Sequence, residues 1–287
     1  AHFFTEVRYK GTKTVAITPD YSEVAKLADI WMNPKQGTDA AVAMAMGHVI
    51  LKEFYFPESG ERSAYFDDYV RRYTDMPMLV MLKEHILPSG EVIAVPDRYV
   101  RASDFNGKMG QANNPEWKTV ALDESGQVVL PNGAIGFRWG ADGRADQGQW
   151  NLQAKEARHG NEVKLKLSVM EGKQASAETA RVGFPYFGGI QHESFPNNVA
   201  KGGTDGAAGD VLVRTVPVQR ISLGKAGEYR EALVATVFDL QVANYGVARG
   251  LPGELAATSF DDDTPYTPAW QEKITGTPRA RYSAAIS

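Results

Sequence analysis

Residues 13–50 constrain the fold more than any other stretch of the chain. Thr14 to Ile17 is a continuous apolar, β-branched run that Pro19 ends. Such a run predicts a fully buried strand of the kind found in the middle of α/β sheets. A second short apolar run, Asp29 to Met32, repeats the pattern and ends at Pro34. The two runs therefore predict two strands at the start of an α/β fold.

An acidic residue follows the first predicted strand. Asp20 lies at the carboxyl end of that strand, and ligands of open α/β sheets bind at this edge. A carboxylate there can accept hydrogen bonds from a ribose or from the N–H edge of a guanine. Alternatively, Asp20 caps the helix that follows, for which Ser22 is also available. The local sequence leaves both roles open.

The second predicted strand leads into Lys35-Gln36-Gly37-Thr38-Asp39. Gly37 permits a tight turn that lets backbone approach a ligand closely, and Thr38 or Asp39 then caps a helix. From Ala40 to Leu51 this helix is apolar nearly all round, so it should be buried. Its first turn offers free N–H groups and a positive dipole end, which suit a purine or a phosphate. A plain helix cap is the alternative interpretation.

The next elements belong to the same predicted unit, residues 1–84. Aromatic residues between Ser63 and Tyr73 recur at three- and four-residue spacings, which predicts an amphipathic helix. Its charged residues, which include Arg71, should form a solvated or partner-facing side. Met76 to Leu82 predicts another buried strand, which we expect to return to a sheet and to complete the first α/β unit near Glu84.

Residues 85–231 have a different character. Turn-forming pairs such as Ser89-Gly90 and Asn132-Gly133 separate short strands. Val163 to Val169 alternates apolar and polar residues, so one face of that strand should be wet. Gly188 to Asp210 is a Gly-rich loop, of a length usually kept for contacts or left disordered. We interpret this region as a mostly β inserted subdomain.

Residues 232–287 turn helical again and return to the α/β unit. Asp239 is expected to cap one helix, and Thr267 to cap another that has Pro268 at its first position. The chain then ends in what we interpret as a truncated C-terminal helix. The predicted organisation is thus an α/β unit interrupted by a β insertion.

Composition excludes several classes of function. The net charge is −4 and charged residues show no basic stripe, so a nucleic-acid partner is not expected. No window approaches the roughly 18 apolar residues of a membrane-spanning helix. The 287 residues include no cysteine, which removes disulfides, thiolate metal ligands and cysteine nucleophiles from anything that this segment does alone.

The candidates for catalysis are few. His48 lies within the predicted buried helix and is expected to be a packed, hydrogen-bonded core residue. The other four histidines show no metal-ligand spacing. Asp261-Asp262-Asp263 could chelate a hard cation, but a solvated turn is the favoured interpretation. His192-Glu193-Ser194 contains the residue types of a hydrolase triad without a nucleophile elbow, so no catalytic or metal-binding residue is predicted.

Several segments carry a stronger signal together than alone. They are residues 13–21 (KTVAITPDY), 34–41 (PKQGTDAA), 69–82 (YVRRYTDMPMLVML), 113–120 (NNPEWKTV), 131–140 (PNGAIGFRWG) and 182–189 (VGFPYFGG), followed by Asn244-Tyr245-Gly246 and Tyr266 to Trp270. Read in order, they resemble the catalytic alpha subunit of respiratory membrane-bound nitrate reductase, of the molybdopterin oxidoreductase superfamily. The resemblance covers residues 1 to about 276.

The resemblance implies a Rossmann-like unit that binds molybdopterin guanine dinucleotide, with a mostly β insertion. It implies a full subunit with a molybdenum bis(molybdopterin guanine dinucleotide) cofactor and a 4Fe-4S cluster, which reduces nitrate to nitrite by two electrons in anaerobic respiration. The implied partners are an iron–sulfur beta subunit and a membrane haem gamma subunit. The implied location is the cytoplasmic face of the inner membrane, reached through the complex.

The resemblance also assigns roles to individual residues. In that family the Thr-Pro-Asp strand end and the Gln-Gly-Thr-Asp helix start lie against the guanine-bearing end of one dinucleotide, and the lysine beside that helix start would offset phosphate charge. The cofactor-binding residues implied here are Thr18, Asp20, Lys35, Gln36, Gly37, Thr38 and Asp39.

The chain departs from the family pattern at both ends. The family's molybdenum-ligating Asp and its cluster-binding His and Cys residues lie upstream of the region that matches Ala1, and the sequence after Gly276 differs. We therefore expect an internal fragment that is inactive alone. Two alternatives stay open: another molybdopterin oxidoreductase, acting on formate or on an S- or N-oxide, and a non-catalytic guanine-nucleotide-binding remnant.

Overall fold

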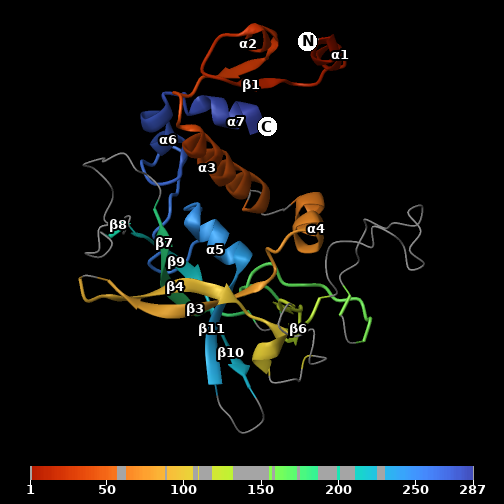
Figure 1. Ribbon diagram of the computed structural model, residues 1–287, viewed down its shortest axis with the longest axis vertical. Helices are drawn as coiled ribbons and strands as arrows, with labels where there is room; N and C mark the ends of the chain where they lie inside the picture. The colour runs from red at the N-terminus through yellow and green to blue at the C-terminus, as the bar shows by residue number, and fades with distance from the viewer. Residues whose placement is uncertain are drawn as a thin grey trace.

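A computed structural model (Figure 1) describes residues 2–56, 63–87, 89–105, 109, 118–131, 155–156, 159–172, 175–186, 199–200, 211–224 and 230–286. The predicted Gly-rich loop, apart from residues 199–200, lies outside these ranges, as do His192-Glu193-Ser194 and the turn at Asn132-Gly133. The described residues form a mixed α/β structure built around a largely antiparallel sheet, which confirms the α/β class.

The start of the chain forms a small unit with its own two-stranded sheet. It consists of helix α1 (His2–Tyr9), strand β1 (Val15–Ile17), helix α2 (Glu23–Leu27) and strand β2 (Ile30–Met32). The two strands run parallel, with Ala16 opposite Trp31. Both strands predicted from the apolar runs are therefore present, but the prediction that the first is fully buried is wrong, because Ile17 of β1 is 46% exposed.

Helix α3 (Asp39–Ile50) connects this unit to the rest of the molecule and continues as a π-helical turn, η1 (Leu51–Tyr55). Its apolar sequence predicts burial on several sides, and the structure confirms it. Val49 packs with Met32 of β2 in one apolar cluster, whereas Ala41 belongs to the main core with Trp270. Helix α3 therefore lies between the opening unit and the large sheet (Figure 1).

The large sheet has seven strands. Their spatial order is β10 (Gln219–Leu223), β11 (Arg230–Thr236), β3 (Leu79–Ile86), β4 (Val92–Tyr99), β7 (Thr179–Pro185), β9 (Val211–Pro217) and β8 (Val199–Ala200). Every neighbouring pair is antiparallel except β4 and β7. The main core, which includes Leu82, Val182 and Leu212, lies on this sheet.

The strand predicted at Met76 to Leu82 is present as β3, and it lies in the seven-stranded sheet rather than beside β1 and β2. It pairs instead with β4, through the turn at Ser89-Gly90, and with β11. A hairpin partner a few residues away is easier to reach than a parallel partner, which needs a crossover connection. The division into residues 1–84, 85–231 and 232–287 stays a prediction.

The remaining described elements are α4 (Ala64–Tyr73), η2 (Ala102–Phe105), β5 (Ala121–Leu122), β6 (Val128–Val129), α5 (Val237–Asn244), α6 (Pro268–Thr275) and α7 (Ala280–Ile286). The hydroxyl of Thr267 caps α6 as predicted, accepting from the N–H of Trp270 at 3.1 Å. The predicted cap of α5 is wrong, because Thr236 holds that position and accepts from the N–H of Asp239. No helix in this described part of the chain is long and apolar enough to cross a bilayer.

One residue predicted to be solvated and one predicted wet strand face are largely shielded from solvent, whereas Asp68 on the charged side of α4 is 57% exposed as predicted. The side chain of Arg71 on α4 is 13% exposed, because it lies between Asp67 and Glu171 and donates to the carbonyl of Leu165. The segment predicted to alternate, 163–169, has no wet face from residue 165 onward. Even Lys166 is buried there, and burial lowers the pKa of its ammonium.

Gly47→Ala should lower the free energy of unfolding by about 1–3 kcal/mol, the usual cost of overpacking. A Cβ on Gly47 would lie 2.2 Å from Cε1 of Tyr245, and that ring also packs edge-on against Tyr266. Urea unfolding measures the change. In a Tyr245→Ala background the same substitution should cost nothing, so equal losses in both backgrounds would contradict the packing argument.

Candidate functional site

The polar ends of β1 and β2 lie at one edge of the small parallel sheet. The N–H of Thr18 donates to the carbonyl of Met32 at 3.0 Å, which extends the ladder by one bond beyond β1. The indole N–H of Trp31 donates to the carbonyl of Thr18 at 2.9 Å. Thr18 is thus fixed by its backbone, and the residues after it begin a loop at the carboxyl edge of the sheet.

Asp20 lies in that loop with its side chain exposed. Its N–H donates to the hydroxyl of Thr18 at 3.4 Å, and its carbonyl accepts from the N–H of Ser22 at 2.8 Å. Helix α2 starts at Glu23 with Ser22 in the cap position, so the alternative that Asp20 caps this helix is wrong. Its carboxylate stays available to a ligand.

The segment from Lys35 to Asp39 forms a tight turn that leads into α3. Gly37 has a φ of 76°, which favours glycine, and the N–H of Thr38 donates to the carbonyl of Lys35 at 3.2 Å. The hydroxyl of Thr38 donates to the same carbonyl at 2.6 Å and makes no cap bond to α3. Thr38 therefore occupies the cap position as predicted. Its hydroxyl does not accept from the first N–H groups of α3, so these groups are uncapped.

The side chains of this turn are exposed. Lys35, Gln36 and Asp39 all face solvent, so a cation, an amide and a carboxylate surround the start of α3. The N-terminal end of a helix attracts anions, and Lys35 adds a positive charge beside it. The edge can thus hold a phosphate, while the carboxylates of Asp39 and Asp20 can accept N–H groups of a base.

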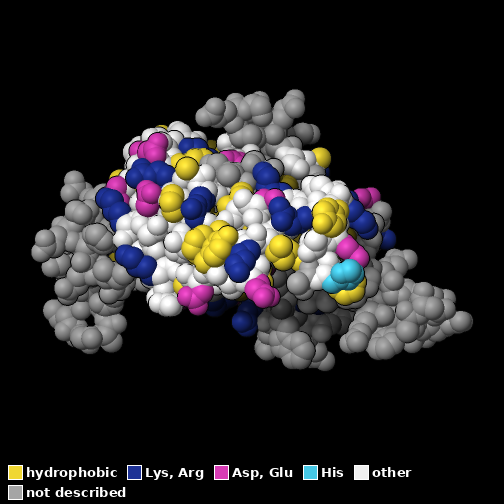
Figure 2. All heavy atoms as spheres, turned by 90° about the horizontal axis from the view of Figure 1, so that it is seen from above, with side chains coloured by type: hydrophobic (Ala, Val, Ile, Leu, Met, Phe, Trp, Pro, Cys, Tyr) yellow, Lys and Arg dark blue, Asp and Glu magenta, His cyan; other side chains and the backbone are white. Residues whose placement is uncertain are grey.

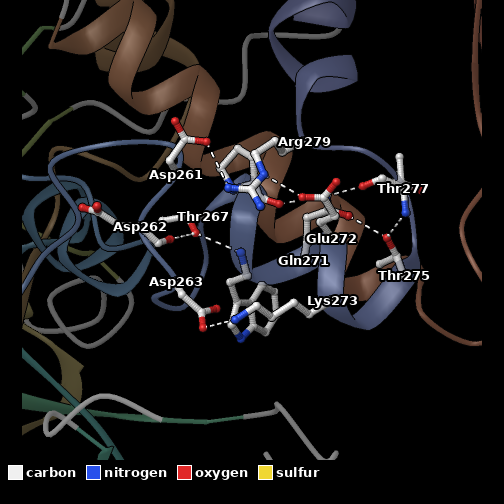
Figure 3. Close-up of polar contacts among 12 residues, drawn as sticks. Asp261, Asp262, Asp263, Thr267, Gln271, Glu272, Lys273, Thr275, Thr277 and Arg279 are labelled. Carbon is white, nitrogen blue, oxygen red and sulfur yellow. Dashed lines mark hydrogen bonds and ion pairs between the residues drawn. The ribbon is translucent and has the colours of Figure 1, made fainter. Parts of the chain in front are cut away.

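A buried polar network fixes the turn from behind (Figure 3). The N–H of Lys35 donates to the carbonyl of Thr275 at 2.9 Å. The hydroxyl of Thr275 donates to Gln271 at 2.6 Å, and the amide of Gln271 donates to the carbonyl of Thr277 at 2.8 Å. Local sequence reasoning missed this network. The one signal in the sequence is Gly276, a residue type that commonly ends a helix, and it ends α6 here in the left-handed conformation.

The acidic triplet beside this network is a set of separate contacts (Figure 3). Asp261 pairs with Arg279 at 3.0 Å and Asp263 pairs with Lys273. Asp262 accepts from the N–H of residue 258 at 2.8 Å and of residue 259 at 3.0 Å. The three carboxylates therefore serve different partners, and no cluster of potential metal ligands is found among the residues that the structure describes.

His48 occupies the position expected of a core residue. It is buried, and its Nδ1 donates to the carbonyl of Tyr245 at 2.7 Å. Burial lowers the pKa of His48 to about 4. The ring is therefore neutral at pH 7, and its hydrogen bond serves packing rather than ligand binding.

Fold and site together define a mixed α/β protein with a polar, anion-attracting edge at the carboxyl ends of a parallel strand pair. No family model matches the chain. The chain is 53% identical over 98% of its length to the respiratory nitrate reductase 1 alpha chain of Escherichia coli (strain K12). It is 50% identical over 97% to the respiratory nitrate reductase 2 alpha chain of the same strain, and 40% identical over 96% to the nitrate reductase alpha chain of Bacillus subtilis (strain 168).

The chain is therefore homologous to one region of the respiratory nitrate reductase alpha chains, which confirms the resemblance inferred from the sequence. It spans about a fifth of the length of these relatives: 20% of either Escherichia coli protein and 19% of the Bacillus protein.

Proposed function

We propose that this chain is the part of a respiratory nitrate reductase alpha subunit that binds the guanine-bearing end of a molybdopterin guanine dinucleotide. One observation supports this most directly: the carboxyl ends of β1 and β2 and the uncapped start of α3 present the predicted residues at one exposed edge. Ligands of α/β sheets bind at such edges. A Rossmann-like arrangement of the complete unit is part of the proposal.

The residues present fit such a group. Thr18, Gly37 and Thr38 set the backbone, because their hydrogen bonds and the positive φ of Gly37 fix both turns. The exposed carboxylates of Asp20 and Asp39 would accept N–H groups of guanine, and Lys35 and Gln36 would bind the phosphate or ribose oxygens. This chain's contribution is to bind and orient the dinucleotide.

The whole enzyme would then reduce nitrate to nitrite in anaerobic respiration, with molybdenum supplying the two-electron chemistry. The bis form of the cofactor, a 4Fe-4S cluster, an iron–sulfur beta subunit, a membrane haem gamma subunit and a position on the cytoplasmic face of the inner membrane belong to the same proposal. The homology to nitrate reductase alpha chains supports them. Because this chain has no cysteine, thiolate ligands of the cluster would come from elsewhere.

Asp39→Ala in the intact enzyme that carries this sequence is expected to lower cofactor affinity by roughly ten- to a hundredfold, the loss of a hydrogen bond to a charged group. Molybdenum and released GMP per subunit measure the occupancy. Asp20→Ala should act in the same direction. Asp39→Asn should show a similar loss if the charge of the carboxylate binds the base.

Asp68→Ala is the matched control, since Asp68 is also an exposed helical aspartate but lies on α4. Its cofactor content should equal that of the unsubstituted enzyme. Unchanged molybdenum and GMP content in both Asp39→Ala and Asp20→Ala would refute the assignment of this edge.

A further inference from the structure

A polar cavity lies between helix α4 and residues 164–172, and none of the residues that line it belongs to the edge beside α3. Its volume is about 210 Å³, which is below the roughly 300–1,000 Å³ of pockets that take drug-sized ligands. Three of the lining side chains are cationic and two are carboxylates. A ligand of this cavity is therefore small and polar. The lining residues are Arg71, Glu124, Lys164, Leu165, Lys166, Glu171 and Gly172.

The two lysines of the cavity belong to the segment whose alternation has no part in the proposed dinucleotide site. The N–H of Glu124 donates to the carbonyl of Lys164 at 3.1 Å, and the N–H of Lys166 donates to the carbonyl of Leu122 at 2.8 Å. These bonds form an isolated antiparallel bridge, along which side chains alternate. The side chain of Leu165 packs in an apolar cluster. Lys164 and Lys166 therefore share the opposite face, and both line the cavity.

Most carboxylates around the cavity are engaged by other donors. Oε2 of Glu171 accepts from Arg71 at 3.1 Å and from the N–H of Leu167 at 2.9 Å. Asp67 pairs with the same guanidinium at 2.8 Å. Asp123 accepts from two N–H groups of its own turn, both at 2.9 Å. These contacts balance the charge of Arg71 and hold the walls of the cavity in place.

The ion pair of Lys164 with Glu124 is easily exchanged. Its nitrogen and oxygen are 2.7 Å apart, but the two side chains are 66% and 59% exposed. Exposed pairs contribute little to stability, because water and salt screen them. An anion in the cavity can therefore replace Glu124 as the partner of Lys164 at small cost.

Lys166 supplies a second, buried charge. The residue is 1% exposed, and burial lowers the pKa of its ammonium although Asp123 and Glu171 act in the opposite direction. Gly172 gives this side chain its room, because a Cβ there would lie 3.0 Å from Cε of Lys166. A buried cation gains from an anion within hydrogen-bond distance. The cavity thus brings an exposed and a buried lysine together on one face.

The end of the molecule that carries α1 and α2 offers no such arrangement in its described part. Figure 2 views that end, and the Lys and Arg side chains drawn there are interspersed with Asp and Glu. Mixed charges of this kind largely cancel in the field that a ligand meets. Charge alone therefore marks no oxyanion site on that face, whereas the cavity beside α4 holds two lysines two positions apart.

We infer that this cavity binds a small oxyanion between the ammonium groups of Lys164 and Lys166. Phosphate and nitrate share the necessary chemistry, since each carries several acceptor oxygens around one centre and can accept from both lysines at once. Arg71 positions the site, because it donates to the carbonyl of Leu165, the residue between the two lysines. None of these contacts involves the proposed dinucleotide edge.

Acetylation of amines in the full-length subunit that carries this sequence tests this site, read at each lysine by mass spectrometry of its peptides. About 10 mM phosphate or nitrate, compared with chloride at equal ionic strength, should slow the acetylation of Lys164 by about threefold or more, because a bound oxyanion covers its amine. Lys83 is the control, since it is 62% exposed and pairs with Asp97 at 2.8 Å outside the cavity. Its rate should not change, and the oxyanion that protects Lys164 at the lower concentration is the ligand.

Lys166→Met removes the buried ammonium, keeps a side chain of similar length and should abolish the protection of Lys164. Lys83→Met, the matched variant, should leave that protection intact. Equal slowing of Lys164 and Lys83 in the unsubstituted subunit would overturn the assignment, as would no slowing with either oxyanion. Full protection of Lys164 in Lys166→Met would also overturn it, because the anion would then need only the exposed lysine.

Discussion

Asp239→Ala is expected to lower the free energy of unfolding by about 3–5 kcal/mol, the usual cost of removing one partner of a buried ion pair. Asp239 is fully buried, and one of its oxygens accepts from Arg249 at 2.6 Å and from Ser168 at 2.6 Å. The other accepts from the N–H of Val169 and the hydroxyl of Thr236, both at 2.9 Å. Alanine would leave the guanidinium, which is 3% exposed, without this carboxylate.

Denaturant unfolding measures this loss, and two variants make the measurement specific. Asp68→Ala removes an exposed ion pair with Arg72 and should change stability by less than about 1 kcal/mol. The double variant Asp239→Leu, Arg249→Met removes both charges and should lose less than Asp239→Ala alone. If Asp239→Ala and the double variant had equal stability, the unpaired buried charge of Arg249 would not be the cause of the loss.

Lowering the pH from 7 to 4 is expected to destabilise the protein by up to about 3 kcal/mol through His48 alone. Burial lowers the pKa of this imidazole from 6.5 to about 4. Its Nε2 is buried without a hydrogen-bond partner among the described residues, so a proton there would have no acceptor. Between these two pKa values the unfolded chain binds a proton that the folded chain does not, and stability therefore falls as the pH falls.

The measurement is the free energy of unfolding at several pH values between 7 and 4, compared with His48→Gln. The variant should lose stability less steeply over this window, whatever its stability at pH 7. His85→Gln, at an exposed position on β3, should keep the slope of the unsubstituted protein. Hydrogen bonds from Thr14 and an ion pair with Arg8 lower the pKa of Asp29 to about 2, so Asp29 also reduces stability as the pH approaches 4, but this loss is common to both proteins and cancels in the comparison. A His48→Gln curve parallel to the original would contradict the prediction.

Local patterns predicted local structure well. The apolar runs gave β1 and β2, the apolar stretch from residue 40 gave α3, and Thr267-Pro268 gave the start of α6. Each depends on preferences within a few residues, such as the β-branched side chains of a strand or a hydroxyl that caps its own helix. The positions of Asp20 and of the turn at Gly37 followed from the same elements.

Long-range pairing was not predictable from these patterns. The alternation in residues 163–169 is typical of a half-exposed strand, yet Ser168 is buried because it binds Asp239, 71 residues further along the chain. Arg71 is buried for a similar reason, since it reaches the carbonyl of Leu165 and Glu171. Sequence periodicity reports which face is apolar, but it does not report a polar partner contributed by a distant segment.

The contact of Arg281 with Trp31 joins residues 250 positions apart, and this separation has a consequence for biosynthesis. At roughly 5–20 residues per second, a ribosome needs about 10–50 s to translate that interval. During this time β2 and the turn at Lys35 have left the ribosome without α6 and α7, which hold them in place. The edge formed by the carboxyl ends of β1 and β2 and the start of α3 therefore takes its final shape only after residue 281 has been translated, and a ligand of this edge would bind after that point.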